Sequence, residues 1–92
     1  GISIWAEAQG NQNVVIWIEH GGAALNDLEL RASNSSGEMV TIDGAEWTIV
    51  SSGLSSVTYV YGPNPQGKVI TVYIIYKPSH QKIFASSSIV VR

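Results

Sequence analysis

Turn-forming residues interrupt this chain every eight to twelve residues, which leaves little room for helices. Such clusters occupy residues 10–13, 20–22 and 62–67. Between them the chain is rich in β-branched and aromatic residues, which fill 33 of its 92 positions and favour strands. Short strands at this spacing are typical of a sandwich. We therefore predict one all-β domain, residues 1–92, folded as an immunoglobulin-like β-sandwich of seven to eight mainly antiparallel strands.

The pattern of apolar residues distinguishes strands with one buried face from central strands. Residues 2–9 and 28–33 alternate apolar and polar side chains, which indicates strands with one buried face each. Residues 14–19 and 68–76 are almost continuously apolar. We predict both as central strands and expect the first to be covered on its two faces.

The other predicted strands are shorter or less regular. They are residues 39–42, 45–50, 57–61 and 82–92. Asp43-Gly44 is a strong hairpin signal between the first two. Residues 25–30 would also fit a short helix, although the alternation after Asp27 favours a strand.

Composition excludes several classes of protein. The chain has no cysteine, so disulfide scaffolds, cysteine-based zinc sites and cysteine nucleophiles are excluded. Its net charge of −2 gives no basic footprint, so we expect no nucleic-acid partner. The longest apolar runs, such as residues 14–18, are far shorter than the roughly 20 residues of a membrane-spanning helix.

The charges are divided unevenly along the chain. Residues 1–46 contain all seven acids and one base, whereas residues 47–92 contain four bases and no acid. This division would suit a bipolar molecule that stacks head to tail. The favoured interpretation is that strands from the two halves interleave and so mix the charges in space.

Candidate catalytic and metal-binding groups are few. The two histidines, His20 and His80, form no metal-binding spacing, and no serine lies in a Gly-x-Ser-x-Gly elbow. Asp27 and Glu29 share one strand face and could hold a weak calcium ion, but two solvated acids are the favoured interpretation. We predict no catalytic residue, no metal site and no cofactor.

Aromatic residues are numerous for so short a chain. They include Trp5, Trp17, Trp47, Tyr59, Tyr61, Tyr73 and Tyr76. Their neighbours place Trp17 and Tyr73 in the core, where aromatic rings bury large areas. Trp5, Tyr59 and Tyr61 are candidates for an exposed aromatic interface, either between proteins or for stacking on sugars.

Asn34-Ser35-Ser36 is the only Asn-x-Ser/Thr sequon in the chain. It falls in a predicted surface turn, where the side chain would be accessible for glycosylation. Asn34 is therefore a candidate glycosylation site.

Two segments resemble archaeal type IV pilin-like proteins. The stretch NVVIWIEHGGAALNDLELRA resembles the family's strand-turn-strand signature, with His20-Gly21-Gly22 at the turn. The stretch GKVITVYIIYKPSHQKIFASSSIVV is similar to the closing hairpin, with Pro78-Ser79 at its turn. The chain departs from the pattern at Ala23, where an acid often follows the paired glycines, so any role of that acid does not transfer.

The resemblance implies a β-sandwich head carried on an N-terminal hydrophobic helix that packs into a filament core. These residues do not include that helix, and it would be the only contact with a membrane. The implied partners are like subunits of the filament or a surface-layer protein, and the implied location is extracellular or at the cell surface.

The resulting hypothesis is a non-enzymatic assembly domain, the head of an archaeal pilin-like filament subunit. One alternative is an archaellum anchor of the FlaF or FlaG type that binds the surface layer. The other alternative is a carbohydrate-binding or adhesive module that uses the exposed aromatic residues.

Overall fold

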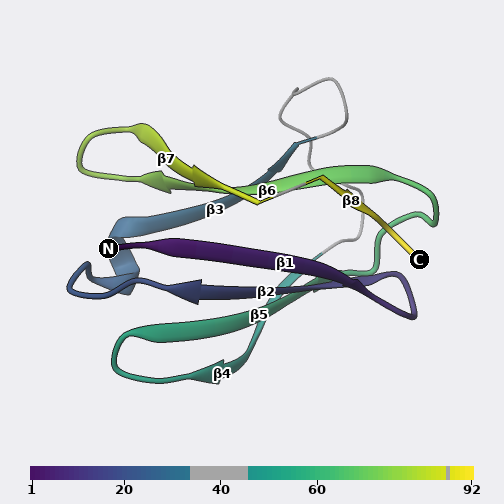
Figure 1. The fold of residues 1–92 in the computed structure, drawn as a ribbon, viewed down its shortest axis with the longest axis horizontal. Helices are drawn as coiled ribbons and strands as arrows, with labels where there is room; N and C mark the ends of the chain where they lie inside the picture. Colours follow the sequence, from purple (N-terminus) through teal and green to yellow (C-terminus); the bar gives the residue numbers. More distant parts are fainter. Residues whose placement is uncertain (34–45, 87) are drawn as a thin grey trace.

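The computed structural model describes residues 1–33, 46–86 and 88–92, and its strands form two antiparallel sheets packed face to face (Figure 1). Sheet A has the order β1 (Ser3–Gln9), β2 (Asn13–Glu19), β5 (Ser56–Gly62) and β4 (Glu46–Ser52). Sheet B has the order β3 (Leu28–Ser33), β6 (Val69–Tyr76) and β7 (Gln81–Ala85), and β8 (Ile89–Val90) also pairs with β6. The predicted β-sandwich is confirmed.

The strand order follows a known arrangement. Lettered in chain order, the strands of sheet A run A-B-E-D and those of sheet B run C-F-G, as in constant-type immunoglobulin sandwiches. This order supports the immunoglobulin-like assignment, which stays a prediction. Each sheet combines strands from both halves of the chain, as predicted, but the expected mixing of charges is wrong, because the strands of sheet A contain acids and no base.

The core lies between the sheets and follows the period of two. On β2 the inward side chains are Val14, Ile16 and Ile18, and on β6 they are Ile70, Val72 and Ile74, all at most 2% exposed. Leu28, Ala32, Val57, Tyr61, Ile89 and Val91 complete the cluster. Burying each large aliphatic side chain contributes about 1.5–3 kcal/mol.

Two predictions about strands are wrong. Strand β2 is central in its sheet but is covered on one face only, and Trp17 on its other face is 41% exposed. The predicted strand 82–92 is divided into β7 and β8. Ser86 fills the break because its N–H donates to the Val72 carbonyl at 2.7 Å and its Oγ accepts from the Val72 N–H at 3.0 Å.

The remaining strand predictions agree with the structure in place and type. Residues 25–30, where a helix and a strand both fitted, begin as a 3-10 helix, η1 (Leu25–Asp27), and continue directly as β3. The predicted strand 39–42, the Asp43-Gly44 hairpin and Asn34 lie outside the described residues. In the part that the structure describes, no helix is long and apolar enough to cross a membrane.

Hydrogen bonds close the end of the sandwich at which the chain terminates. The Gln12 N–H, in the β1–β2 turn, donates to the Arg92 carbonyl at 2.8 Å. Asn64, in the β5–β6 loop, is 1% exposed, and its Nδ2 donates to the carbonyls of Tyr61 at 3.0 Å and Gln12 at 3.4 Å. Gln12 Nε2 donates to the Asn64 carbonyl at 3.0 Å. One buried amide therefore joins two loops beside the chain terminus.

Candidate functional site

The outer face of sheet A exposes large apolar side chains. Trp5 on β1 is 62% exposed and lies opposite Trp17 on β2 in the strand register. Val50 on β4 is 56% exposed. Most indole surface is buried in soluble domains, so two exposed tryptophans on adjacent strands indicate a contact surface. We call this surface face A.

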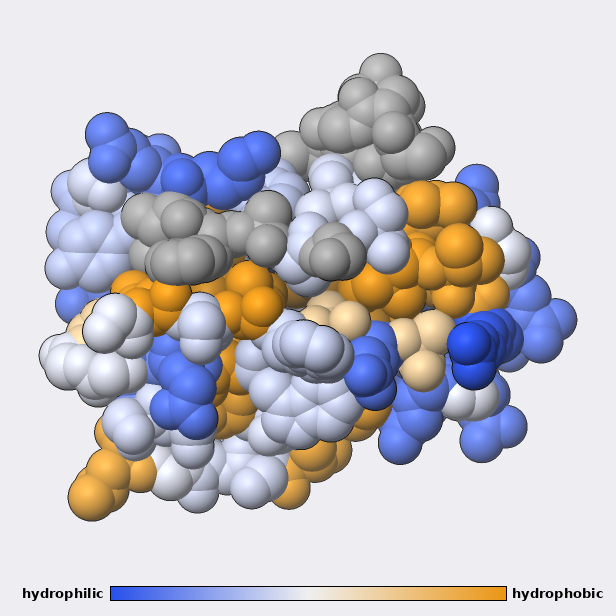
Figure 2. All heavy atoms as spheres, in the orientation of Figure 1, coloured by the Kyte–Doolittle hydropathy of each residue, from blue (hydrophilic) through white to orange (hydrophobic). Residues whose placement is uncertain are grey.

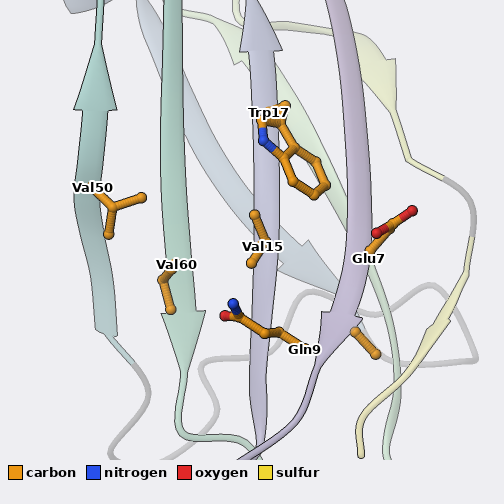
Figure 3. A pocket seen from close by; sticks show the side chains of 7 residues that line it. Glu7, Gln9, Val15, Trp17, Val50 and Val60 are labelled. Carbon is orange, nitrogen blue, oxygen red and sulfur yellow. The ribbon is translucent and has the colours of Figure 1, made fainter.

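A shallow groove of about 380 Å³ runs across face A. Figure 3 shows Trp17 and Val15 on β2, with Val60 and Val50 on one side and Glu7 of β1 on the other. The Gln9 side chain of β1 reaches across β2 beside Val15. Val15 is only 8% exposed, so it forms an apolar floor. The groove thus combines an indole and valines with one carboxylate and one amide.

The two sheets carry different charges. The strands of sheet A contain three acids and no base, and Glu7 and Glu19 belong to its outer face. The strands of sheet B contain one acid, Glu29, and two bases, Arg31 and Lys82. The strands of sheet A therefore carry a net negative charge, whereas those of sheet B carry a small net positive charge.

The outer face of sheet B, which we call face B, carries an ion pair and a cation–ring contact. Arg31 and Glu29 form an ion pair at 2.7 Å. The Lys82 ammonium lies 5.1 Å from the centre of the Tyr73 ring, and Tyr73 itself is 6% exposed. Tyr73 is buried as predicted, beneath a lysine on the outer side of its sheet.

The predicted exposed aromatic set is wrong for Tyr61. Trp5 is exposed, but Tyr61 is 3% exposed and stacks on Trp47 with ring centres 4.1 Å apart. Tyr59 is half-buried and meets the edge of Trp47 at 6.3 Å. Both tyrosines share the inward side of β5 with Val57, so they line the core and do not join Trp5.

Trp17 is the aromatic residue that the sequence misplaces. It stands in the run Val14 to Ile18, where every residue is apolar and the period of two is hidden. The signal that could identify its outward direction is Glu19, two positions later on the same side of the strand. In the structure the aromatic neighbour of Trp5 is Trp17, whereas the sequence suggested Tyr59 and Tyr61.

Burial raises the pKa of the Tyr59 hydroxyl above its ordinary value of 10.0. The folded state therefore keeps this proton to higher pH than the unfolded state, and this contribution to stability falls as pH rises above about 10. We expect Tyr59→Phe to flatten the decline in stability between about pH 9 and pH 11. Urea denaturation of both proteins at the two pH values measures this, and parallel declines would contradict it.

The residues of the family-like turns have structural roles. His20 is 6% exposed, and its Nδ1 lies 2.9 Å from the Ala23 carbonyl, to which it donates. Gly21 has a φ of 56°, in the left-handed region that favours glycine, and Gly22 follows it in the turn. Pro78 and Ser79 occupy the exposed β6–β7 turn.

Outside face A, the exposed large apolar side chains include Ile49 on β4, one residue in a turn and one on β8. Leu54, in the β4–β5 turn, is fully exposed, and Val90 on β8 is 57% exposed. Figure 2 shows hydrophobic atoms over β8 and a hydrophobic projection at the β4–β5 turn. Across residues 1–33, 46–86 and 88–92, no three histidine or acidic side chains gather in a way that could hold a metal ion.

Comparisons with protein-family models, with curated proteins and with solved structures found no match to this chain.

Proposed function

We propose that this protein is a non-enzymatic assembly domain of a cell-surface structure, of the kind that the resemblance to archaeal pilin-like heads implies. The observation that carries the proposal is face A, where Trp5, Trp17 and Val50 are each more than two-fifths exposed. Covering such an apolar surface with another surface lowers the free energy of the system. The low charge of the chain, 13% of residues, is consistent with a domain that spends much of its life packed against neighbours.

The proposal is tested in the cell with the full-length gene product. We expect immunogold labelling against the sandwich to mark filaments or a regular layer on intact cells. Labelling confined to the cell interior, with no hydrophobic helix in the full-length product, would rule the proposal out. An anchor of the FlaF or FlaG type would instead label the cell envelope without marking extended filaments.

A second candidate function, carbohydrate binding, is favoured by the composition of the groove. Sugar rings stack their apolar faces on indoles. A carboxylate accepts hydrogen bonds from sugar hydroxyls, and an amide can both donate to them and accept from them. Trp17 would supply the stacking surface, with Glu7 and Gln9 beside it. We expect glycan-array binding, if this function holds, to be lost on Trp17→Ala and kept on Leu54→Ala, and no binding to any glycan would reject it.

A further inference from the structure

We propose that face A of one copy of this chain packs on face B of the next copy, so that the domains associate head to tail. The inference rests on the proposed function and names both the partner and the two surfaces. It concerns Trp5, Trp17 and Glu7 on face A, and Arg31 and Lys82 on face B.

Charge is the first argument for this pairing. Face A carries Glu7 and Glu19 and no base, whereas face B carries Arg31 and Lys82 against the single acid Glu29. Two copies of face A would bring carboxylates against carboxylates. Opposite potentials attract and like charges repel, so the electrostatic term favours an A-on-B contact over an A-on-A or a B-on-B contact.

Surface chemistry is the second argument. Face A offers two exposed indoles, which stack well on guanidinium groups and on the hydrocarbon stems of lysines. Face B presents both kinds of group, because Arg31 and Lys82 are exposed on it. Ile75 and Thr71 on β6 are part-buried on the same side, so the surface between the charges is not uniformly polar.

The position of the two faces determines the kind of assembly. Sheets A and B form the two layers of the sandwich, so their outer faces point away from each other (Figure 1). A contact between unlike faces leaves one face of each kind free at the ends of a pair. Such a heterologous contact propagates into a ring or an open stack, whereas a contact between like faces stops at a dimer.

The size of the faces indicates a weak contact. A four-stranded face with strands about 20 Å long measures about 400 Å², so one contact would bury about 800 Å² in total. This area is below the usual 1,200–2,000 Å² of stable interfaces, as expected for a contact that acts between subunits already held close together. The isolated domain should therefore associate only at millimolar concentration.

The test blocks one face at a time in the 92-residue chain, which contains both faces and the core. Trp5→Lys adds a cation to face A, and Lys82→Glu adds an acid to face B. The matched controls make the same changes off both faces: Leu54→Lys in the β4–β5 turn and Lys77→Glu in the β6–β7 turn, where both native side chains are exposed. Circular dichroism verifies folding, and Glu7→Lys replaces Trp5→Lys if that variant does not fold.

Sedimentation velocity at millimolar concentration measures the association. We expect the wild type and both controls to form dimers and larger species, and each face variant to associate at least tenfold more weakly. A mixture of Trp5→Lys with Lys82→Glu should regain association, because one variant keeps an intact face B and the other an intact face A.

Three results would overturn the inference. The wild type could stay monomeric throughout, the Lys82→Glu variant could associate as strongly as the wild type, or the mixture could fail to regain association. Surface labelling without association in solution would support the proposed function and reject the A-on-B contact. Association in solution without surface labelling would support the A-on-B contact and reject the proposed function.

Discussion

Replacing Ile16 with alanine should lower the free energy of unfolding by about 3–4 kcal/mol. Ile16 is completely buried in the middle of β2, between Ala6 on β1 and Tyr59 on β5 in the strand register. Alanine removes three carbon atoms there and leaves a cavity that two hydrogen-bonded neighbouring strands cannot close. Domains of this size have about 5–15 kcal/mol of stability in total, so the loss is a large fraction of it.

Urea denaturation with an unchanged m-value measures this loss, and thermal unfolding should show a fall of at least about 12 °C. The matched control is Ile49→Ala on β4, where the isoleucine is 52% exposed. We expect the control to cost less than about 1 kcal/mol, because little apolar area leaves the protein interior. Similar losses for the two variants would show that the division between core and surface is wrong.

Replacing Asn64 should have the second largest effect. Alanine removes the two hydrogen bonds that Asn64 Nδ2 donates, to the Tyr61 carbonyl and to the Gln12 carbonyl, in a position where Asn64 is 1% exposed. We expect a loss of about 1–3 kcal/mol, because each of the two buried hydrogen bonds contributes about 0.5–1.5 kcal/mol. Gln66→Ala, at an exposed position of the same loop, is the control and should change stability by less than about 0.5 kcal/mol.

Asn64→Asp should be worse than Asn64→Ala at neutral pH. The amide is needed as a donor, and its Oδ1 has no hydrogen-bond partner among the described residues. A carboxylate would face carbonyl oxygens, so its pKa in the folded state would rise and stability would fall as pH rises above about 4. Denaturation midpoints between about pH 4 and pH 7 test this, and an Asp variant as stable as the wild type would contradict the assigned donor role.

The period of two and the turn residues predict most of this fold because each strand of a sandwich has one solvent-exposed face and one buried face. That rule fails on β2, where Val15 and Trp17 point outward but are apolar. It also fails at Ser86, whose backbone and side chain both bond to Val72 and interrupt the predicted strand 82–92. Neither exposed apolar side chains on an outer face nor a side chain that substitutes for a hydrogen bond of the sheet can be recognised from periodicity.

The candidate site was only partly predictable for a related reason. Exposure of Trp5 follows from its place on the polar side of an alternating strand, whereas Tyr59 and Tyr61 look equally suited to either side of β5. Their side is determined by the register with β2, where they face Ile16 and Val14. Such pairings join residues far apart in the chain, and a single sequence does not contain them.

The bond between the Gln12 N–H and the Arg92 carbonyl also affects the order in which the domain can be made. Strand β8 pairs with β6, and Arg92 closes the β1–β2 turn, so segments far apart in the sequence meet in the folded domain. Contacts of such wide separation slow folding, and these cannot form until Arg92 has been synthesised. During synthesis the exposed tryptophans of β1 and β2 therefore emerge well before the sandwich can close, which makes this interval the one in which the nascent chain most needs protection from aggregation.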